Sequence, residues 1–123
     1  MPKDEYSLNS LLELVRKFVQ ERDWEPYHKP ASLAISASIE AGELLELFQW
    51  LTDEEITDYL KNEEFREALS QEIADVMIYL LRLSDVVGID PAAAIIDKMT
   101  ANEMKYPAKG WKGRIPSKTR NFQ

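Results

Sequence analysis

The chain contains no cysteine among its 123 residues, which excludes disulfide bonds and thiolate chemistry. It also lacks an apolar run long enough to span a bilayer. The N-terminal segment MPKDEYSLNS lacks the basic and apolar regions of a signal peptide. These absences predict a cytoplasmic protein without a membrane partner. The length suits one compact domain, and no stretch shows internal repeats or strand-like alternation.

Charged residues are unevenly distributed along the chain. The net charge is −7, yet the segment 107–123 contains five cations and no acidic residue. The rest of the chain therefore carries a net charge of −12. An acidic body argues against a nucleic-acid partner and is compatible with a site that collects metal cations. Most of these acids are nevertheless expected to solvate helix faces.

Apolar residues recur at helical spacing through nearly the whole chain, which predicts an all-α fold. Four long helices and one short helix are predicted, at 8–22, 30–51, after Thr52, 63–87 and 91–106. Ser10 and Glu13 have the spacing of a capping box near the start of the first helix. We therefore expect a four-helix-bundle-like domain over 1–106, followed by a basic C-terminal tail over 107–123 that has no clear period.

Two of the predicted helices place an acidic residue inside an apolar face. On a wheel of about 100° per residue, Glu40 lies among the leucines of its helix. Glu72 lies among the apolar residues of the long helix in the same way. Each is followed three residues later by a second acid, which is Glu43 in one helix and Asp75 in the other. Arg82, a cation of the long helix, points away from these acids.

Burying these four carboxylates requires partners, because an unpaired buried charge is costly. A divalent cation between the helices would offset their repulsion, and oxygen ligands suit Mg²⁺ or Mn²⁺. Salt bridges to a neighbouring subunit are the alternative explanation. Neither helix contains a histidine, which argues against the di-iron bundles that use Glu-x-x-His pairs.

Several motifs in the chain resemble the MazG-like all-α nucleoside triphosphate pyrophosphohydrolases. The resemblance covers roughly 19–107 and is carried by ERDWEPYHKPASLAISASIEAGELLELFQW and QEIADVMIYLLRLSDVVGIDPAAAIIDKMTANEMKYP. The dCTP pyrophosphatase subgroup is the most similar. Many other members have a further glutamate where this chain has Ile39, and isoleucine suits the dCTP-type pattern. The resemblance implies hydrolysis of dCTP or a modified dCTP to the monophosphate and pyrophosphate.

The resemblance also implies roles for the acidic residues. In the family, Mg²⁺ is held by the acids that match Glu40, Glu43, Glu72 and Asp75, and Mn²⁺ is expected to substitute for it. Glu43, at the edge of the apolar stripe, is the candidate general base, and Glu40 is the second catalytic candidate. Glu46, on the same helix, is either a partner of the ligands or, slightly favoured, a surface acid.

Two further groups of residues are candidates for substrate contacts. Lys98, Asn102 and Lys105 share a face of the last long helix, where two cations and an amide can bind phosphate oxygens. Taken alone, this spacing indicates an ordinary solvated face, and only the resemblance favours the phosphate role. A nucleobase pocket is implied for four aromatic or imidazole side chains, which are Trp24, His28, Trp50 and Tyr79.

The resemblance further implies a homo-oligomer, a tetramer built as a dimer of dimers, with the tail either covering a neighbour's site or extending freely. Two alternatives to a dCTP-directed enzyme stay open. One is a dUTP-directed or broad-specificity pyrophosphatase, and the other is a non-enzymatic helical adaptor whose acids pair with a partner. Acids within the apolar stripes argue against the adaptor, because leucine there would stabilise it more.

Overall fold

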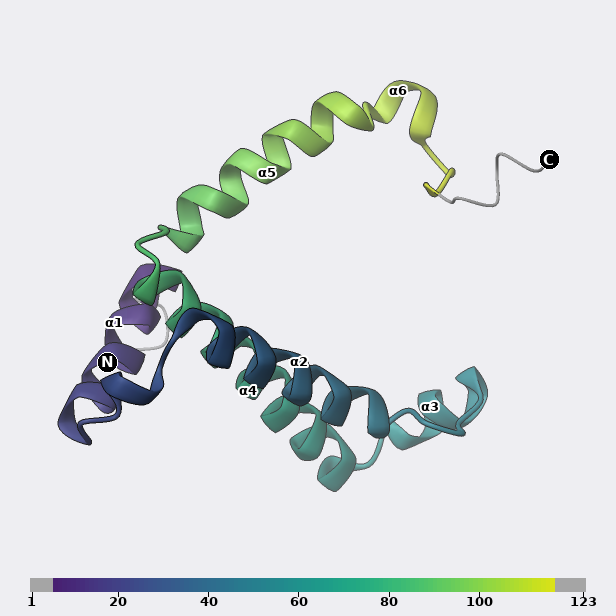
Figure 1. Ribbon diagram of the computed structural model, residues 1–123. Coiled ribbons are helices and arrows are strands. Elements are labelled where there is room, and N and C mark those ends of the chain that lie inside the picture. The colour runs from purple at the N-terminus through teal and green to yellow at the C-terminus, as the bar shows by residue number, and fades with distance from the viewer. Residues whose placement is uncertain (1–5, 117–123) are drawn as a thin grey trace. The chain divides into compact units, whose positions relative to one another are not determined.

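The computed structural model describes residues 6–116, and every regular element among them is helical (Figure 1). The elements are α1 (Leu8–Glu21), the 3₁₀ turn η2 (Glu25–Tyr27), α2 (Pro30–Glu46), α3 (Asp53–Tyr59), α4 (Glu63–Val86), α5 (Pro91–Lys105) and α6 (Ala108–Trp111). The predicted all-α fold is therefore confirmed. None of the described helices combines the length and hydrophobicity that crossing a membrane requires.

The chain divides into two compact units at the start of α5. The first unit ends at Pro91 and contains α1 to α4, and the second begins at Ala92 and contains the rest of α5 with α6. The predicted boundary between a helical domain and a basic tail, after residue 106, stays a prediction. Lys118 and Arg120 of that tail lie outside the described residues.

Helices α2 and α4 lie side by side and make the most extensive contact in the first unit (Figure 1). Helix α1 packs against α4. The buried apolar residues come from these three helices and are Leu12, Val19, Leu33, Ala37 and Leu81. Leu33 and Ala37 are four residues apart, so they lie on one face of α2, and the next position along that face is Glu40. The face that packs α2 on α4 therefore continues into an acidic residue.

Hydroxyl side chains cap α1 and α3. Ser7 Oγ accepts a hydrogen bond from the backbone N–H of Ser10 at 3.0 Å, and the Ser7 N–H donates to Ser10 Oγ at 2.8 Å. The helix begins at residue 8, as predicted, but the predicted capping box of Ser10 and Glu13 is wrong, because the box is formed one turn earlier by Ser7 and Ser10. Thr52 forms a capping box at α3, which confirms the short helix predicted there.

Helix α2 ends at Glu46 rather than at residue 51, where the sequence pattern predicts its end. The amides of residues 47–49 donate to carbonyls three residues back, the tightened geometry typical of a helix end. Trp50 then has a φ of +68°, in the left-handed region that glycine usually occupies after a helix. Because the apolar stripe continues past the last helical turn, periodicity alone overestimates the length of this helix.

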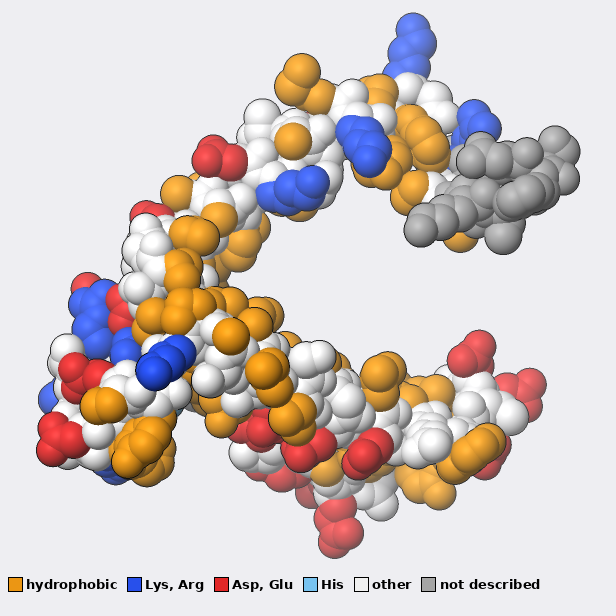
Figure 2. All heavy atoms as spheres, in the orientation of Figure 1, with side chains coloured by type: hydrophobic (Ala, Val, Ile, Leu, Met, Phe, Trp, Pro, Cys, Tyr) orange, Lys and Arg blue, Asp and Glu red, His pale blue; other side chains and the backbone are white. Residues whose placement is uncertain are grey.

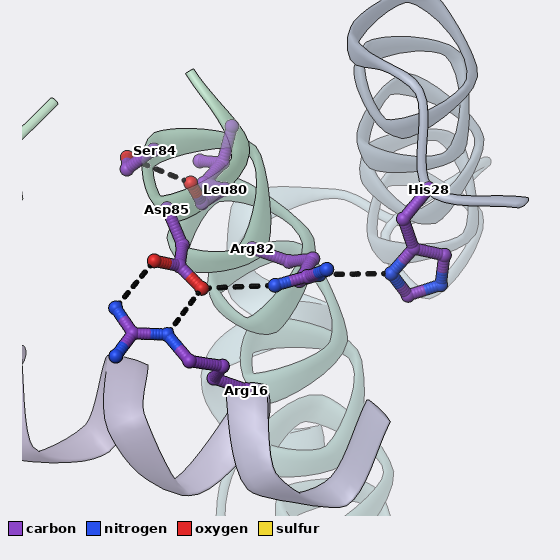
Figure 3. Close-up of polar contacts among 6 residues, drawn as sticks. All are labelled: Arg16, His28, Leu80, Arg82, Ser84 and Asp85. Atoms are coloured by element: carbon purple, nitrogen blue, oxygen red, sulfur yellow. Dashed lines mark hydrogen bonds and ion pairs between the residues drawn. The ribbon is translucent and has the colours of Figure 1, made fainter. Parts of the chain in front are cut away.

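A network of charged side chains joins α1, α4 and the segment before α2 (Figure 3). Asp85 accepts hydrogen bonds from Arg16 Nε and Arg82 Nη1, both at 2.9 Å, and from Arg16 Nη2 at 2.5 Å. Arg82 Nε donates to Nδ1 of His28 at 3.0 Å. The Arg82 side chain is 8% exposed and that of Asp85 is 12% exposed, so water screens their interaction poorly.

In the second unit, α6 is a short irregular turn beyond α5. Gly110 has a φ of +105° there, and Trp111 packs edge-on against Tyr106 with ring centroids 4.9 Å apart. The guanidinium carbon of Arg114 lies 5.8 Å from the ring centroid of Trp111. The sequence pattern predicts no element at this point. Aromatic contacts, which have no periodic signature, tie this turn to the end of α5.

Replacing Asp85 with asparagine is expected to destabilise the fold by about 3 kcal/mol, because the buried Arg82 loses its anionic partner. Hydrogen bonding from Arg16 holds the pKa of Asp85 below its usual value of 3.8. The carboxylate therefore contributes stability above the unfolded-state pKa, and this contribution is lost as pH falls through the folded-state pKa. Denaturant midpoints of wild type and Asp85→Asn should differ at neutral pH and converge in acid.

Asp58→Asn is the matched control for this measurement. Asp58 pairs with Lys61 at 3.6 Å, but both side chains are largely exposed. The denaturant midpoint of Asp58→Asn should therefore stay close to that of wild type. An equally small change in Asp85→Asn would mean that the network contributes no stability.

Candidate metal centre

Glu40 and Glu43 of α2 face Glu72 of α4 where these two helices pack together. One carboxylate oxygen from each of the three lies within 4.8 Å of the other two. Figure 2 shows acidic side chains gathered along this pair of helices. The packing of α2 on α4 thus brings together three of the four acids that the sequence pattern predicts as metal ligands.

Two of these carboxylates carry a buried oxygen without a hydrogen-bond partner. The atoms are Oε2 of Glu40 and Oε2 of Glu72. A buried carboxylate oxygen without a partner raises the free energy of the fold, most of all when the group is ionised. Within residues 6–116, no lysine, arginine or histidine side chain forms an ion pair with either glutamate. The cluster therefore lacks a compensating positive charge from the described part of the chain.

Mutual repulsion and burial also change the protonation of the cluster. A side-chain hydrogen bond with Glu43 raises the pKa of Glu40 to about 7, and burial and the neighbouring negative charges act in the same direction. Burial raises the pKa of Glu72, again with help from the charges of Glu43 and Asp75. Full ionisation of the cluster is therefore unfavourable unless a cation offsets its charge.

Asp75 and Glu46 border the cluster of three. The charge of Asp75 raises the pKa of both Glu40 and Glu72, so Asp75 acts on the same site. Glu46 is exposed, as its interpretation as a surface acid expects, yet its charge also raises the pKa of Glu72. Ligation of a metal by Asp75 stays a prediction.

The donor set fits a hard divalent cation. All three converging groups offer carboxylate oxygens, the ligands that Mg²⁺ and Mn²⁺ prefer. A cation at this point would give the two buried oxygens a partner. It would also remove the repulsion that raises the pKa values of Glu40 and Glu72.

The sequence of this chain is similar to that of a known protein family. A sequence profile of the MazG-like family matches residues 35–114, a range that contains all four predicted ligands. The chain belongs to the MazG-like family. The family resemblance predicted from the motifs is therefore confirmed.

Named relatives of this MazG-like chain include dCTP pyrophosphatase 1 of Homo sapiens, which is 40% identical over 104 residues, 85% of this chain and 61% of that protein. The protein of the same name from Rattus norvegicus is 40% identical over 103 residues, with 84% and 61% coverage. The chain thus spans less than two thirds of the length of these curated relatives. The crystal structure of a pyrophosphatase from Archaeoglobus fulgidus is 42% identical, with a TM-score of 0.75, and the match covers 87% of this chain and 98% of that one.

The predicted phosphate-binding residues of the MazG-like chain lie on α5, in the second unit. Lys98 is exposed, whereas Asn102 is half-buried with its Nδ2 3.9 Å from the sulfur of Met99. Lys105 Nζ lies 5.3 Å from the ring centroid of Tyr106. Helical spacing therefore places three nitrogen-bearing side chains along α5, and their phosphate role stays a prediction.

The four residues predicted to contact a nucleobase have different surroundings in the first unit. Trp24 packs edge-on against Phe18 with ring centroids 5.7 Å apart, and Tyr79 is half-buried on α4. His28 accepts a hydrogen bond from the charged network of Figure 3. Trp50 is 90% exposed. Contact of these residues with a nucleobase stays a prediction.

The partners of His28 are the part of the site that sequence patterns in this MazG-like chain miss. The helical wheel predicts only that Arg82 points away from the acidic stripe, and its bonds to His28 and Asp85 agree with that. The available signal is the spacing of Arg82 and Asp85, three residues apart on one helix. Such pairs are common on solvated helix faces, so the spacing alone does not indicate a buried network.

Glu40→Gln should alter how stability depends on pH when divalent cations are absent. Glu40 has a folded-state pKa of about 7, above its ordinary value of 4.5. The folded state therefore favours protonated Glu40. The stability that this protonation contributes is fully present below the unfolded-state pKa and is lost as pH rises through about 7. The melting temperature of Glu40→Gln should rise relative to that of wild type over this interval. Calorimetry in the presence of a chelator measures the difference.

Mg²⁺ added at a pH above 7 should raise the melting temperature of wild type and leave that of Glu40→Gln nearly unchanged, because a ligand stabilises the state that binds it. Glu67→Gln provides the control, since Glu67 is an exposed glutamate on α4. This control should respond to Mg²⁺ as wild type does. Equal responses of wild type and Glu40→Gln would show that the cation binds elsewhere.

Proposed function

We propose that this chain is a Mg²⁺-dependent nucleoside triphosphate pyrophosphohydrolase that converts dCTP, or a modified dCTP, to the monophosphate and pyrophosphate. The cluster of Glu40, Glu43 and Glu72, with two buried oxygens that lack partners, is the observation that carries the proposal. A triphosphate is itself strongly negative, so an acidic cluster suits it only when a cation lies between them.

The comparisons support the same class of reaction. The chain belongs to the MazG-like family and is similar to proteins named dCTP pyrophosphatase 1 and to a structure described as a pyrophosphatase. The proposed preference for dCTP rests on the names of the longer relatives. The substrate panel below tests that preference separately from the reaction class.

The acidic residues divide the chemistry among themselves. Glu40 and Glu72 would hold the cation through their buried oxygens, with Asp75 beside them. When bound, Mg²⁺ supplies charge compensation for the triphosphate and increases the acidity of water. Glu43 is exposed, which suits a general base that meets the attacking water. The water oxygen bonds to the α-phosphorus, and its proton passes to a Glu43 oxygen. The bond from the α-phosphorus to the oxygen that bridges it to the β-phosphate breaks, and pyrophosphate leaves with that oxygen.

Other parts of the chain are proposed to bind the rest of the substrate and to assemble the enzyme. Lys98, Asn102 and Lys105 would bind phosphate oxygens, which the acids repel. We further infer a cytoplasmic homotetramer, arranged as a dimer of dimers. Large apolar side chains on α2 and α5 that remain exposed support the assembly, among them Ile39, Leu45 and Ile96.

Trp50 is the strongest candidate for stacking on the nucleobase. Its side chain is 90% exposed, so it gains little stability from burial. Its φ of +68° is also unfavourable for a bulky residue. Backbone strain at an exposed aromatic residue favours a binding role, because packing does not explain it. Trp24 and His28 precede α2 and Trp50 follows it, and the 17 residues of this helix span about 25 Å. A pocket that combines Trp50 with Trp24, His28 and Tyr79 would therefore take Trp50 from one protomer and the other three from a neighbouring protomer.

Pyrophosphate release in the presence of Mg²⁺ is the deciding assay, run with the canonical dNTPs and NTPs and with 5-methyl-dCTP. We expect release centred on dCTP and its methylated analogue. Glu72→Gln should lower kcat on the order of 100-fold, because an electrostatic contact to the reacting centre is lost. Glu67→Gln, an exposed change on the same helix, should keep wild-type activity.

Each other outcome of the substrate panel has a definite meaning. Release from dUTP, or from every nucleotide, would keep the carboxylate chemistry and replace the dCTP assignment. Absence of release from all of them would contradict the proposed reaction and favour a non-enzymatic adaptor.

Trp50→Gly and Trp50→Ala both remove the indole, but only glycine relieves the left-handed strain. The glycine variant is therefore expected to be more stable than the alanine variant by about 1 kcal/mol in denaturant unfolding. Both should raise KM for the triphosphate to a similar extent, since base stacking contributes about 1–3 kcal/mol. An unchanged KM in both variants would remove Trp50 from the pocket.

A further inference from the structure

Arg82 is buried, with 7% of its surface exposed, and its guanidinium is shared between two partners. Nη1 donates to Asp85 at 2.9 Å, and Nε donates to Nδ1 of His28 at 3.0 Å (Figure 3). The ion pair that joins α1 to α4 is formed by Arg16 and Asp85 and does not involve His28. The bond to His28 therefore calls for a separate explanation.

The bond from Arg82 determines where the proton of His28 lies. A guanidinium has only donors, so Nδ1 of the imidazole must accept and cannot itself carry a proton. The single ring proton then lies on Nε2, which becomes a hydrogen-bond donor. Burial, and then the charge of Arg82, lower the pKa of His28, so the ring is neutral at pH 7. One tautomer of a neutral ring is thereby selected.

The orientation of Arg82 is itself fixed from the opposite side. Asp85 accepts from Arg82 Nη1 and, through two further bonds, from Arg16 of α1. Charge-assisted bonds of this kind are stronger and more directional than neutral ones. Arg82 would lose its bond to Asp85 if it turned away from His28. Asp85 and His28 therefore hold the guanidinium of Arg82 between them, and Arg16 contacts only Asp85.

We propose that Arg82 is a positioning residue, which holds His28 as a neutral donor whose Nε2–H binds an acceptor atom on the nucleobase of the substrate. This inference rests on the proposed function and adds a polar contact of defined direction to the aromatic pocket. A donor of fixed tautomer favours an acceptor, such as a ring carbonyl oxygen, over a donor at the same place on the base. Because the imidazole of His28 is uncharged, it does not compete with the cation for the phosphates.

Nitrogen-15 NMR tests the tautomer directly, because His28 is the single histidine of the chain and gives one set of ring signals. In the full-length wild type at neutral pH we expect protonated Nε2 and unprotonated, accepting Nδ1. Arg82→Met replaces the guanidinium with an unbranched apolar side chain of similar length. The donor to Nδ1 is then absent, so both tautomers of His28 should become populated. Arg16→Met is the matched control, since it removes an arm of the network that does not contact His28.

Kinetics test the contact with the substrate. Arg82→Met should raise KM for the triphosphate about tenfold, the effect of one lost hydrogen bond, with kcat nearly unchanged. Arg16→Met should leave KM at the wild-type value. In a His28→Ala background the donor is already absent, so adding Arg82→Met should raise KM no further. That double variant separates positioning of His28 from a direct contact between Arg82 and the nucleotide.

Several outcomes would overturn the proposal. One is a protonated Nδ1 in wild type, and a second is an unchanged tautomer in a folded Arg82→Met. A third is an equal change of tautomer and KM in Arg82→Met and Arg16→Met, which would make the network purely structural. The wild-type spectrum decides the tautomer even if Arg82→Met does not fold. Absence of any triphosphate turnover in wild type would contradict the proposed function and the substrate contact, while the tautomer of His28 would still be measured.

Discussion

The packing of α2 on α4 buries apolar side chains and also brings carboxylates together. The stability of the first unit depends on the balance between this apolar burial and the repulsion of the carboxylates. Leu33 and Ala37 are buried by this contact, and Glu40 follows them on the same helix face. Burial of the apolar residues favours the close approach of the helices, whereas repulsion between Glu40 and Glu72 opposes it. A helix pair selected for stability alone would gain from apolar residues at both positions. The two acids therefore lower the stability of the metal-free fold, and the proposed binding of a cation would offset this cost.

Two acidic residues of helix α4, Asp85 and Glu72, have surroundings that shift their pKa values in opposite directions. Asp85 has arginine partners from α1 and from its own helix, and their hydrogen bonds lower its pKa. Glu72 has other acids as neighbours, and burial raises its pKa. The chain thus supplies its own cations to Asp85 near the end of α4, and none of the described residues forms an ion pair with Glu72. Acids of the same chemical type take different roles because their surroundings differ.

The features that could be predicted from the sequence are those encoded within one helix. Periodicity is local, so it indicates the all-α fold and places Glu40 and Glu72 within apolar faces. The end of α2 could not be predicted in this way, because the apolar stripe continues through turns that are no longer helical. The contact of Arg82 with His28 joins positions 54 residues apart. It depends on how the segment before α2 meets α4, which no local pattern records.

The unpartnered oxygens between α2 and α4 have a consequence for laboratory evolution of this protein. A library screened for heat resistance in a chelating buffer would enrich neutral or apolar replacements at Glu40 and Glu72, because each removes a repelled charge. Its most stable members would be helical proteins without the acidic cluster. With Mg²⁺ present, the proposed binding of the ion would stabilise folded chains that keep both acids, so the same library would retain them. The buffer of the screen would therefore determine which residues occupy positions 40 and 72.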